Sequence, residues 1–237
     1  LYVEAVKRGG DRQQLHEIIR RCSMEATARM KEGQSPDLLS LLAAHPEMLG
    51  THVLQITGGM PELPILIKLI DAKKDLSVQV HPDDEYAKRD GQWGKTEMWY
   101  IIDCEPNSYL YYGLNRTVTK EEFIEHIENN TLLEILNKMP VHKGDVFFIP
   151  SGTIHAICSG ILICEIQQNS NTTYRVYDYD RRGKDGKPRE LHIEKAVDVS
   201  DLSPAASQKV YNDNTLAECK YFTVKKIACH GSAEIQL

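Results

Sequence analysis

The sequence lacks long hydrophobic runs, since no stretch approaches the roughly 20 apolar residues that a membrane span needs. It also lacks an excess of basic residues: 28 Lys and Arg stand against 34 Asp and Glu, for a formal net charge of −6. Because nucleic-acid-binding proteins usually carry a basic face, we expect neither nucleic acid nor a membrane as a partner. A small anionic substrate is not excluded, since it needs only a local basic pocket.

Paired cysteines are lacking too. None of the cysteines lies in a CxxC pair, the spacing of many zinc and redox sites. No signal peptide is recognisable, although the chain begins with Leu rather than Met, which leaves an upstream signal open. We therefore expect free thiols, several of them in the core, and a cytoplasmic protein. The cysteines are Cys22, Cys104, Cys158, Cys164, Cys219 and Cys229.

Hydrophobic periodicity divides the chain into a helical start and a β-rich remainder. Residues 11–33 have a helical pattern that Gly33 and Pro36 end, and a second short helix fits residues 36–48. A capping box at Thr119 begins a helical insert over residues 119–139. Apolar or alternating runs predict strands at 65–70, 76–81, 98–103, 108–112, 145–149, 155–158, 161–168, 172–177 and 221–228.

The most specific motif is Gly144-Asp-Val-Phe-Phe-Ile-Pro150-Ser-Gly152-Thr-Ile-His155. It fits G-x5-P-x-G-x2-H, the second signature of cupin barrels. Gly144 permits a tight turn before a strand, and Pro150 with Gly152 shapes the turn after it. His155 then opens the next strand, where a neutral imidazole that points into the barrel can bind a metal. The alternative is a plain hairpin with a hydrogen-bonded histidine.

A second group of candidate metal ligands precedes this motif. Gln79 and His81 share one strand face because strand side chains alternate, and Glu97 follows 16 residues after His81. With His155 they offer two nitrogens and two oxygens, a reasonable zinc shell with room for water or substrate. Iron or manganese would accept the same residue types. Gln79 is the weakest member, because a strand amide can equally be a structural hydrogen-bonding group.

Three charged residues are candidates for catalysis. Glu165 could act as a base or an acid, and the guanidinium of Arg175 suits a phosphate or an oxyanion. From spacing alone, a solvated strand with paired charges explains both residues equally well. Lys95 lies two residues before Glu97, which places both on one strand face, although a surface lysine is the default for that residue type.

These segments together resemble the short bacterial form of type I phosphomannose isomerase, from about residue 37 to about residue 202. The resemblance is carried by residues 76–87, 94–103, 144–157, 167–180 and 189–196. It implies a mainly β cupin barrel, one zinc ion, and interconversion of mannose 6-phosphate and fructose 6-phosphate. It implies His81, Glu97 and His155 as ligands with Gln79 as a fourth. It also places Arg175 on the family's active-site arginine, and Lys95 and Glu165 on positions that face the substrate.

The chain departs from this family at both ends. The Trp-Gly-Gly segment with which such proteins begin is absent, and residues 3–31 resemble instead a helical stretch near the end of adenylosuccinate lyase. The family's second, smaller jelly roll is also absent. We therefore expect a helical segment of foreign appearance at 1–36, a cupin core at 37–202, and a linker with the start of a further β region at 203–237.

An aldose–ketose isomerase of this type would work through a cis-enediol, with zinc as a Lewis acid for the sugar oxygens. Two alternatives remain open at this point. One is another metal cupin, such as an iron oxygenase that uses two histidines and a carboxylate. The other is a sugar-binding or inactive cupin, since the missing ends would expose sheet edges and core.

Overall fold

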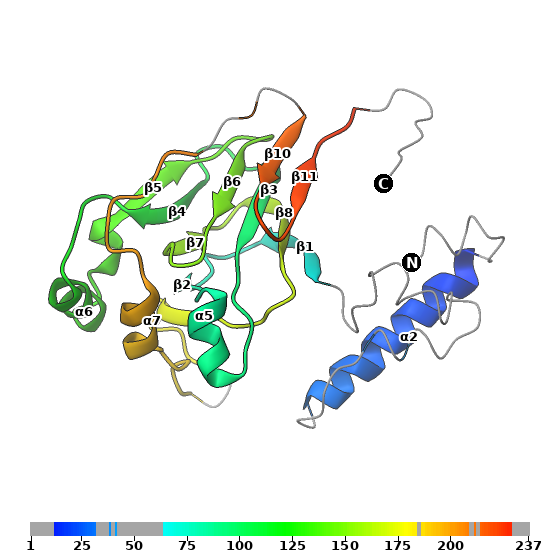
Figure 1. Ribbon diagram of the computed structural model, residues 1–237, viewed down its shortest axis with the longest axis horizontal. Coiled ribbons are helices and arrows are strands. Elements are labelled where there is room, and N and C mark those ends of the chain that lie inside the picture. Colours follow the sequence, from blue (N-terminus) through cyan, green and yellow to red (C-terminus); the bar gives the residue numbers. More distant parts are fainter. Residues whose placement is uncertain are drawn as a thin grey trace. The chain divides into compact units, whose positions relative to one another are not determined.

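The computed structural model describes residues 12–31, 38, 41, 64–183, 186–208, 211 and 214–228 (Figure 1). Contacts divide the chain into two compact units, Leu1–Pro64 and Ile65–Leu237. Within the described ranges, no helix is both long enough and apolar enough to cross a membrane. The five described cysteines are free thiols, as predicted, and Cys229 lies outside the described residues.

The described part of the first unit is essentially one helix, α2 (Arg12–Lys31). Ile18, Cys22 and Ala26 are its buried apolar residues. They are spaced four residues apart, so they lie on one face of the helix. The predicted helix over 11–33 is therefore confirmed. The second predicted helix, over 36–48, lies almost entirely outside the described residues.

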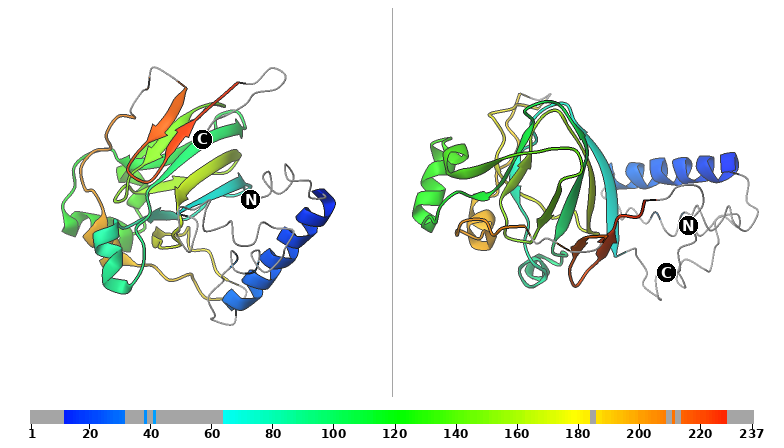
Figure 2. Two further views of the ribbon diagram at one scale, coloured as in Figure 1. Left: turned by 45° about the vertical axis from the view of Figure 1, so that its right-hand side comes forward. Right: turned by 90° about the horizontal axis from the view of Figure 1, so that it is seen from above.

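The second unit is built from two antiparallel sheets that face each other (Figure 2). The four-stranded sheet has the order β1-β8-β3-β6, with β1 (Ile65–Ala72), β8 (Ile161–Gln168), β3 (Glu97–Cys104) and β6 (Val146–Ile149). The five-stranded sheet has the order β5-β4-β7-β2-β9, with β5 (Leu136–Pro140), β4 (Tyr109–Leu114), β7 (His155–Ile157), β2 (Val78–Val80) and β9 (Tyr174–Tyr177). A hairpin of β10 (Thr215–Glu218) and β11 (Thr223–Lys225) follows.

Alternation along the strands sends side chains into separate apolar clusters. Trp99 and Ile163 of the four-stranded sheet pack with Leu110 and Ile157 of the five-stranded sheet, which forms the core between the sheets. The opposite face of β2, with Val78 and Val80, packs against the helices α6 (Lys120–Glu128) and α7 (Ile193–Val199). Each large apolar side chain buried in this way contributes about 1.5–3 kcal/mol relative to an exposed one. The space between the sheets is therefore closed by apolar packing at its centre.

Short helices connect the strands. They are α5 (Asp84–Ala87), α6 (Lys120–Glu128), α7 (Ile193–Val199) and the 3₁₀ turns η2 (Lys88–Asp90) and η3 (Leu132–Ile135). Thr119 caps α6 as predicted, with its side chain accepting a hydrogen bond from the Glu122 amide at 3.1 Å. The predicted strands are confirmed with shifts of one or two residues at their ends, except that the strand predicted at 221–228 is reduced to the three residues of β11. The helices α5 and α7 and the strand β10 were not predicted from the sequence.

The helical insert is shorter than predicted. Asn130 has a left-handed φ of 57°, so the helical conformation does not continue past α6. Residues 136–140 then form β5, in which Leu136 pairs with Leu114 and Met139 with Leu110. The apolar spacing of residues 132–136 fits a helical face, and Leu132–Ile135 do form the 3₁₀ turn η3. From Leu136 on, pairing with the edge of β4 gives the backbone groups hydrogen-bond partners in a sheet instead.

Candidate metal centre

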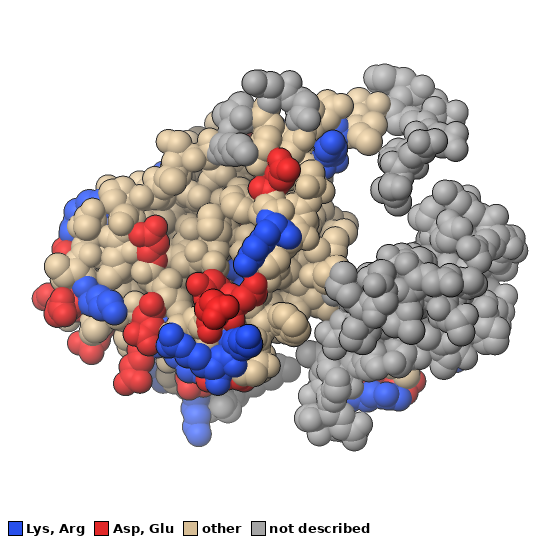
Figure 3. All heavy atoms as spheres, viewed as in Figure 1, with Lys and Arg blue, Asp and Glu red and all other residues tan. Residues whose placement is uncertain are grey.

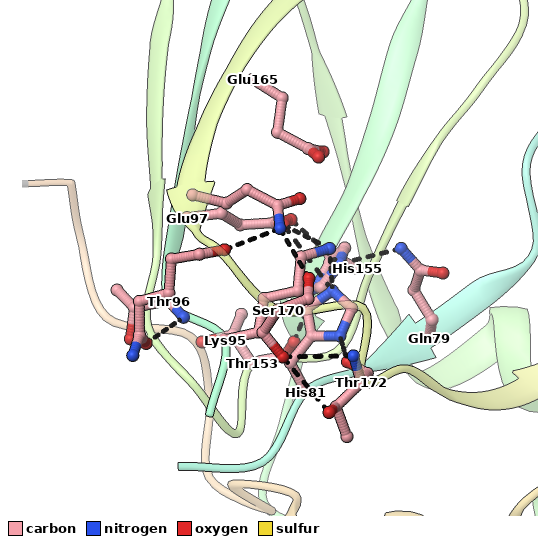
Figure 4. A network of polar contacts seen from close by, with 12 residues as sticks. Gln79, His81, Lys95, Thr96, Glu97, Thr153, His155, Glu165, Ser170 and Thr172 are labelled. Carbon is pink, nitrogen blue, oxygen red and sulfur yellow. Dashed lines mark hydrogen bonds and ion pairs between the residues drawn. The ribbon is translucent and has the colours of Figure 1, made fainter. Parts of the chain in front are cut away.

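Three predicted ligands meet at one end of the barrel (Figure 4). His81 follows β2, Glu97 opens β3 and His155 opens β7, so the group draws on both sheets. One ligand atom from each residue lies within 4.8 Å of the other two. Their exposed fractions are 1%, 0% and 0%. We call these residues the His-Glu-His group.

Two glycines of the cupin motif have the backbone angles that such a site requires. Gly144 has a φ of 95° and Gly152 a φ of 87°, a region that side chains other than glycine rarely adopt. A Cβ atom at Gly152 would also lie 2.9 Å from the carbonyl oxygen of Val199. The Gly152 amide donates to the carbonyl of His81 at 2.8 Å, so the turn that delivers His155 is bonded to His81 as well.

Backbone carbonyls hold both imidazole rings. Nδ1 of His81 lies 2.9 Å from the Thr172 carbonyl oxygen, and Nδ1 of His155 lies 2.8 Å from that of Thr153. A carbonyl can only accept, so each Nδ1 carries the hydrogen and each Nε2 keeps its lone pair. This arrangement fixes the tautomer that a metal-binding histidine needs.

Burial keeps both rings neutral. It lowers the pKa of His155 to about 4, although the Thr153 carbonyl opposes the change. Burial, with the positive charge of Lys95 and the neighbouring His155, lowers the pKa of His81 well below its ordinary value. Both rings are therefore unprotonated at Nε2 at neutral pH, the form that binds metals.

Glu97 has fewer partners than a buried carboxylate normally has. Lys95 Nζ lies 2.8 Å from its Oε2, whereas no donor is bonded to Oε1, which lies 3.3 Å from Nε2 of His155. Since that nitrogen carries a lone pair, two acceptors face each other whenever Glu97 is ionised. Burial raises the pKa of Glu97 to about 7, with Lys95 opposing the change. A divalent cation would satisfy both acceptors at once, so this donor set fits a metal ion.

Lys95 is buried, with 4% exposure, and is not the surface residue that is the default for lysine. Its Nζ lies 2.8 Å from Oε2 of Glu97 and 3.1 Å from Nε2 of His81. Its backbone amide donates to the Pro82 carbonyl at 3.0 Å. Lys95 therefore places a positive charge directly against two members of the group.

Gln79 lies beside the group on β2, where it pairs with His155. Its amide nitrogen is 3.4 Å from Nε2 of His155. The two ends of an amide exchange by a half-turn, which would bring the oxygen to the same position. Gln79 is therefore near enough to take part in ligation.

Glu165 lies in β8, on the same side of the four-stranded sheet as Glu97. Two donors hold its carboxylate. Trp99 Nε1 donates to Oε2 at 3.0 Å, and Lys68 Nζ donates to Oε1 at 2.9 Å. Burial acts to raise the pKa of Glu165, but the charges of Lys95 and Lys68 and these hydrogen bonds outweigh it, and the pKa is lowered. Glu165 is therefore ionised at neutral pH.

Sequence reasoning missed Lys68. It lies in β1, and its Nζ also donates to Gln167 Oε1 at 2.6 Å. The signal was a single charged residue within the apolar run Ile65-Leu66-Ile67-Lys68-Leu69-Ile70. Strand alternation places Lys68 on the face opposite to Ile67 and Leu69, which are 60% and 71% exposed. A charge on the inward face is costly unless it has a partner, so it indicates a buried partner.

Arg175 is in β9, opposite Gln79 on β2. Its Nε donates to Ser77 Oγ at 3.3 Å, and its Nη1 donates to the Glu190 carbonyl at 3.1 Å. These partners are not members of the His-Glu-His group. Cross-strand pairing thus places Arg175 on the same face of the sheet as Gln79, and its side chain is partly buried.

The facing antiparallel sheets and the site between them define a cupin barrel that holds a group able to bind a metal ion. The chain is 48% identical over 184 residues to mannose-6-phosphate isomerase ManA of Bacillus subtilis, a match that covers 73% of this chain and 58% of that protein. It is 52% identical over 160 residues to the probable mannose-6-phosphate isomerase GmuF of the same organism, covering 65% and 48%. Most of the chain is thus related to the mannose-6-phosphate isomerases, and the predicted resemblance is confirmed.

A solved structure supports the same fold. The crystal structure of mannose 6-phosphate isomerase from Bacillus subtilis matches with a TM-score of 0.64 and 40% identity, over 72% of this chain and 58% of that one. The predicted cupin barrel is therefore confirmed. The chain spans about half to three fifths of the length of these relatives.

The start of the chain matches a different family. Residues 1–56 match the family described as the adenylosuccinate lyase C-terminus. The predicted resemblance of residues 3–31 lies inside this match.

Proposed function

We propose that this chain carries the metal-binding catalytic core of a mannose-6-phosphate isomerase, which interconverts D-mannose 6-phosphate and D-fructose 6-phosphate. The observation that carries the proposal is the buried His-Glu-His group in a barrel whose relatives bear that name. A generic sugar-binding cupin would have no need for a buried carboxylate that faces an imidazole lone pair. We also propose a cytoplasmic location, in keeping with the free thiols.

The metal in this proposal is zinc, held by His81, Glu97 and His155 with Gln79 as the fourth ligand. Two imidazoles and a carboxylate suit zinc, and because zinc can expand to five ligands, this set would still leave a position for substrate. When bound, the ion would act as a Lewis acid for the sugar oxygens. Iron and manganese accept the same donors, so the metal must be determined by measurement.

Glu165 is the proposed base. The reaction moves a proton between two adjacent sugar carbons through a cis-enediol, which requires a carboxylate that can accept the proton and return it. Glu165 is ionised at neutral pH, and Trp99 and Lys68 fix both of its oxygens. A fixed carboxylate avoids reorientation during the transfer, which favours catalysis.

Positive charge for the substrate would come from Lys95 and Arg175. Lys95 is buried against Glu97 and His81, so its ammonium would stabilise negative charge that develops on a sugar oxygen. Arg175 borders the site from β9, where its planar guanidinium would bind the phosphate or the enediolate. Both roles require a positively charged side chain that lies beside the His-Glu-His group and is not itself a metal ligand.

The decisive experiment is turnover of mannose 6-phosphate to fructose 6-phosphate by this chain in a coupled assay, before and after metal removal with a chelator. We expect activity to disappear with the metal and to return with zinc. Recovery with iron and consumption of oxygen would indicate an oxygenase instead. Sugar phosphate binding without turnover in the zinc-loaded chain would favour a binding protein and would contradict the proposal.

A further inference from the structure

The carboxylate of Asp84, at the start of α5, joins three segments that are distant in sequence. Its Oδ1 accepts hydrogen bonds from the Gly94 amide at 3.2 Å and from Gln168 Nε2 at 3.0 Å. Its Oδ2 accepts from the Tyr221 hydroxyl at 2.6 Å and from Lys220 Nζ at 3.4 Å. One side chain thus links the loop before β3, the end of β8 and the turn of the β10–β11 hairpin.

The first two of these partners lead directly to the metal centre. Gly94 precedes Lys95, and a Cβ atom at Gly94 would lie 2.5 Å from the backbone nitrogen of Asp84, so the loop packs tightly on α5. Gln168 uses its other end to accept a hydrogen bond from the Thr96 amide at 2.8 Å. The segment of Lys95 and Thr96 is therefore fixed by two contacts, the packing of Gly94 on α5 and the hydrogen bond from Thr96 to Gln168. Asp84 supports both contacts, because it accepts hydrogen bonds from Gly94 and from Gln168.

The hairpin is the third segment. Its residues Ala217 and Phe222 are buried with Met98, the residue after Glu97, and with Ile166. Charged side chains gather over α5 and the adjacent hairpin turn (Figure 3). Apolar packing therefore holds the hairpin against β3, and the Tyr221 hydroxyl connects it to Asp84.

We infer that Asp84 is a positioning residue for the metal centre, and that Tyr221 extends this support to the β10–β11 hairpin. Asp84 acts through Gly94 and Gln168 on the segment that carries Lys95 and Glu97. The inference rests on the metal centre proposed above. It assigns the hairpin a role in holding the ligand geometry, in addition to covering the sheet.

The test measures cobalt(II) binding, by visible absorption and by competition with a chelator, in the whole chain and in Tyr221→Phe. This substitution removes only the hydroxyl. We expect the dissociation constant to rise about tenfold, the lower end of the range for outer partners of metal ligands, and the absorption spectrum of the bound ion to change. Tyr100→Phe is the matched control, because the Tyr100 hydroxyl bonds Lys226 beside the same hairpin at 2.6 Å but has no link to Asp84. We expect it to change affinity less than about twofold, well below the range for outer partners.

Asp84→Asn tests whether the effect passes through this carboxylate. Gly94 and Tyr221 donate to opposite oxygens of Asp84, and an asparagine side chain replaces one of these oxygens by an NH₂ donor, so it loses one of the two bonds. We expect weaker binding than in the parent chain, and little further loss when Tyr221→Phe is added, because the two changes break one network. The thermal midpoint of each variant checks that it is folded.

The outcomes separate the inference from the proposal on which it rests. If the parent chain binds no cobalt at this group, the metal centre fails and the inference fails with it. If the parent chain binds cobalt but Tyr221→Phe behaves like Tyr100→Phe, or the two network changes are additive, only the positioning role is overturned. A tenfold loss confined to the Asp84 and Tyr221 variants establishes it.

Discussion

The candidate site has a metal end, formed by the His-Glu-His group, and an arginine end, formed by Arg175. The two ends differ in how fully the protein itself encloses the side chains. At the metal end, His81, Glu97 and His155 are at most 1% exposed and their ligand atoms lie within 4.8 Å of one another. At the other end, Arg175 is only partly buried, and its guanidinium bonds Ser77 and a backbone carbonyl. Under the proposed function, the fold builds the metal end in advance, whereas the substrate completes the arginine end.

The largest effect should come from His155→Ala. It removes a buried ligand whose ring the Thr153 carbonyl holds at 2.8 Å. We expect the metal dissociation constant to rise by more than about 100-fold, the upper range for outer partners, and activity to be lost with it. His142→Ala is the matched control, since that side chain is 80% exposed. Unchanged metal affinity in His155→Ala would remove this histidine from the ligand set.

Arg175→Ala should lower kcat/KM by about 10²-fold, the usual effect of removing one charge-stabilising donor. Metal affinity should change little, because the guanidinium bonds Ser77 and Glu190 rather than the His-Glu-His group. Steady-state kinetics and chelator competition on the same preparation separate the two quantities. Arg182→Ala, with a side chain 58% exposed, is the comparison variant. A loss of metal affinity in Arg175→Ala would contradict the division of the site into two ends.

Lys68→Met removes one of the charges that lower the pKa of Glu165. The pKa of Glu165 should therefore rise, and the base should be protonated at a higher pH. The acid limb of the kcat/KM profile should move toward neutral pH. At neutral pH the loss should be small, because Glu165 stays largely ionised there, and well below the roughly 10²-fold or more that loss of a general base itself costs. A pH series on Lys68→Met and on Lys143→Met, whose side chain is 72% exposed, checks this. An acid limb at the same pH in both variants would argue against Glu165 as the base.

A feature of this site could be predicted from the sequence when neighbouring residues alone determine it. His155 could be placed because Gly144 and Gly152 adopt positive φ angles that few other residues tolerate, so a sequence motif records the turn. Gln79 and His81 could be assigned to one face because strand alternation needs no tertiary information. Most strands followed from patterns of this kind, whereas the barrel and the full ligand group followed from the family resemblance.

Other features depended on contacts between distant segments. Lys68 meets Glu165 across 97 positions, through pairing of β1 with β8 that the sequence does not specify. Lys95 is buried because its loop is bonded to Pro82 and packed on α5, which the default of a surface lysine could not anticipate. Residues 136–140 became a strand because the edge of β4 was available to pair with them.

The smallest effect should come from Asp178, which follows β9 and accepts hydrogen bonds from Arg189 and from Arg181. Burial acts to raise the pKa of Asp178, but these hydrogen bonds outweigh it, and the pKa is below its ordinary value of 3.8. Because both arginines are partly exposed, Asp178→Asn should lower the free energy of unfolding by only about 1 kcal/mol. A lowered folded-state pKa stabilises above the unfolded value, so the difference from the parent chain should be constant above about pH 5 and shrink in acid. Denaturant unfolding at several pH values measures it, with Asp180→Asn, 78% exposed, for comparison. Metal affinity should be unchanged in both variants, because Asp178 bonds Arg181 and Arg189, which are not members of the His-Glu-His group.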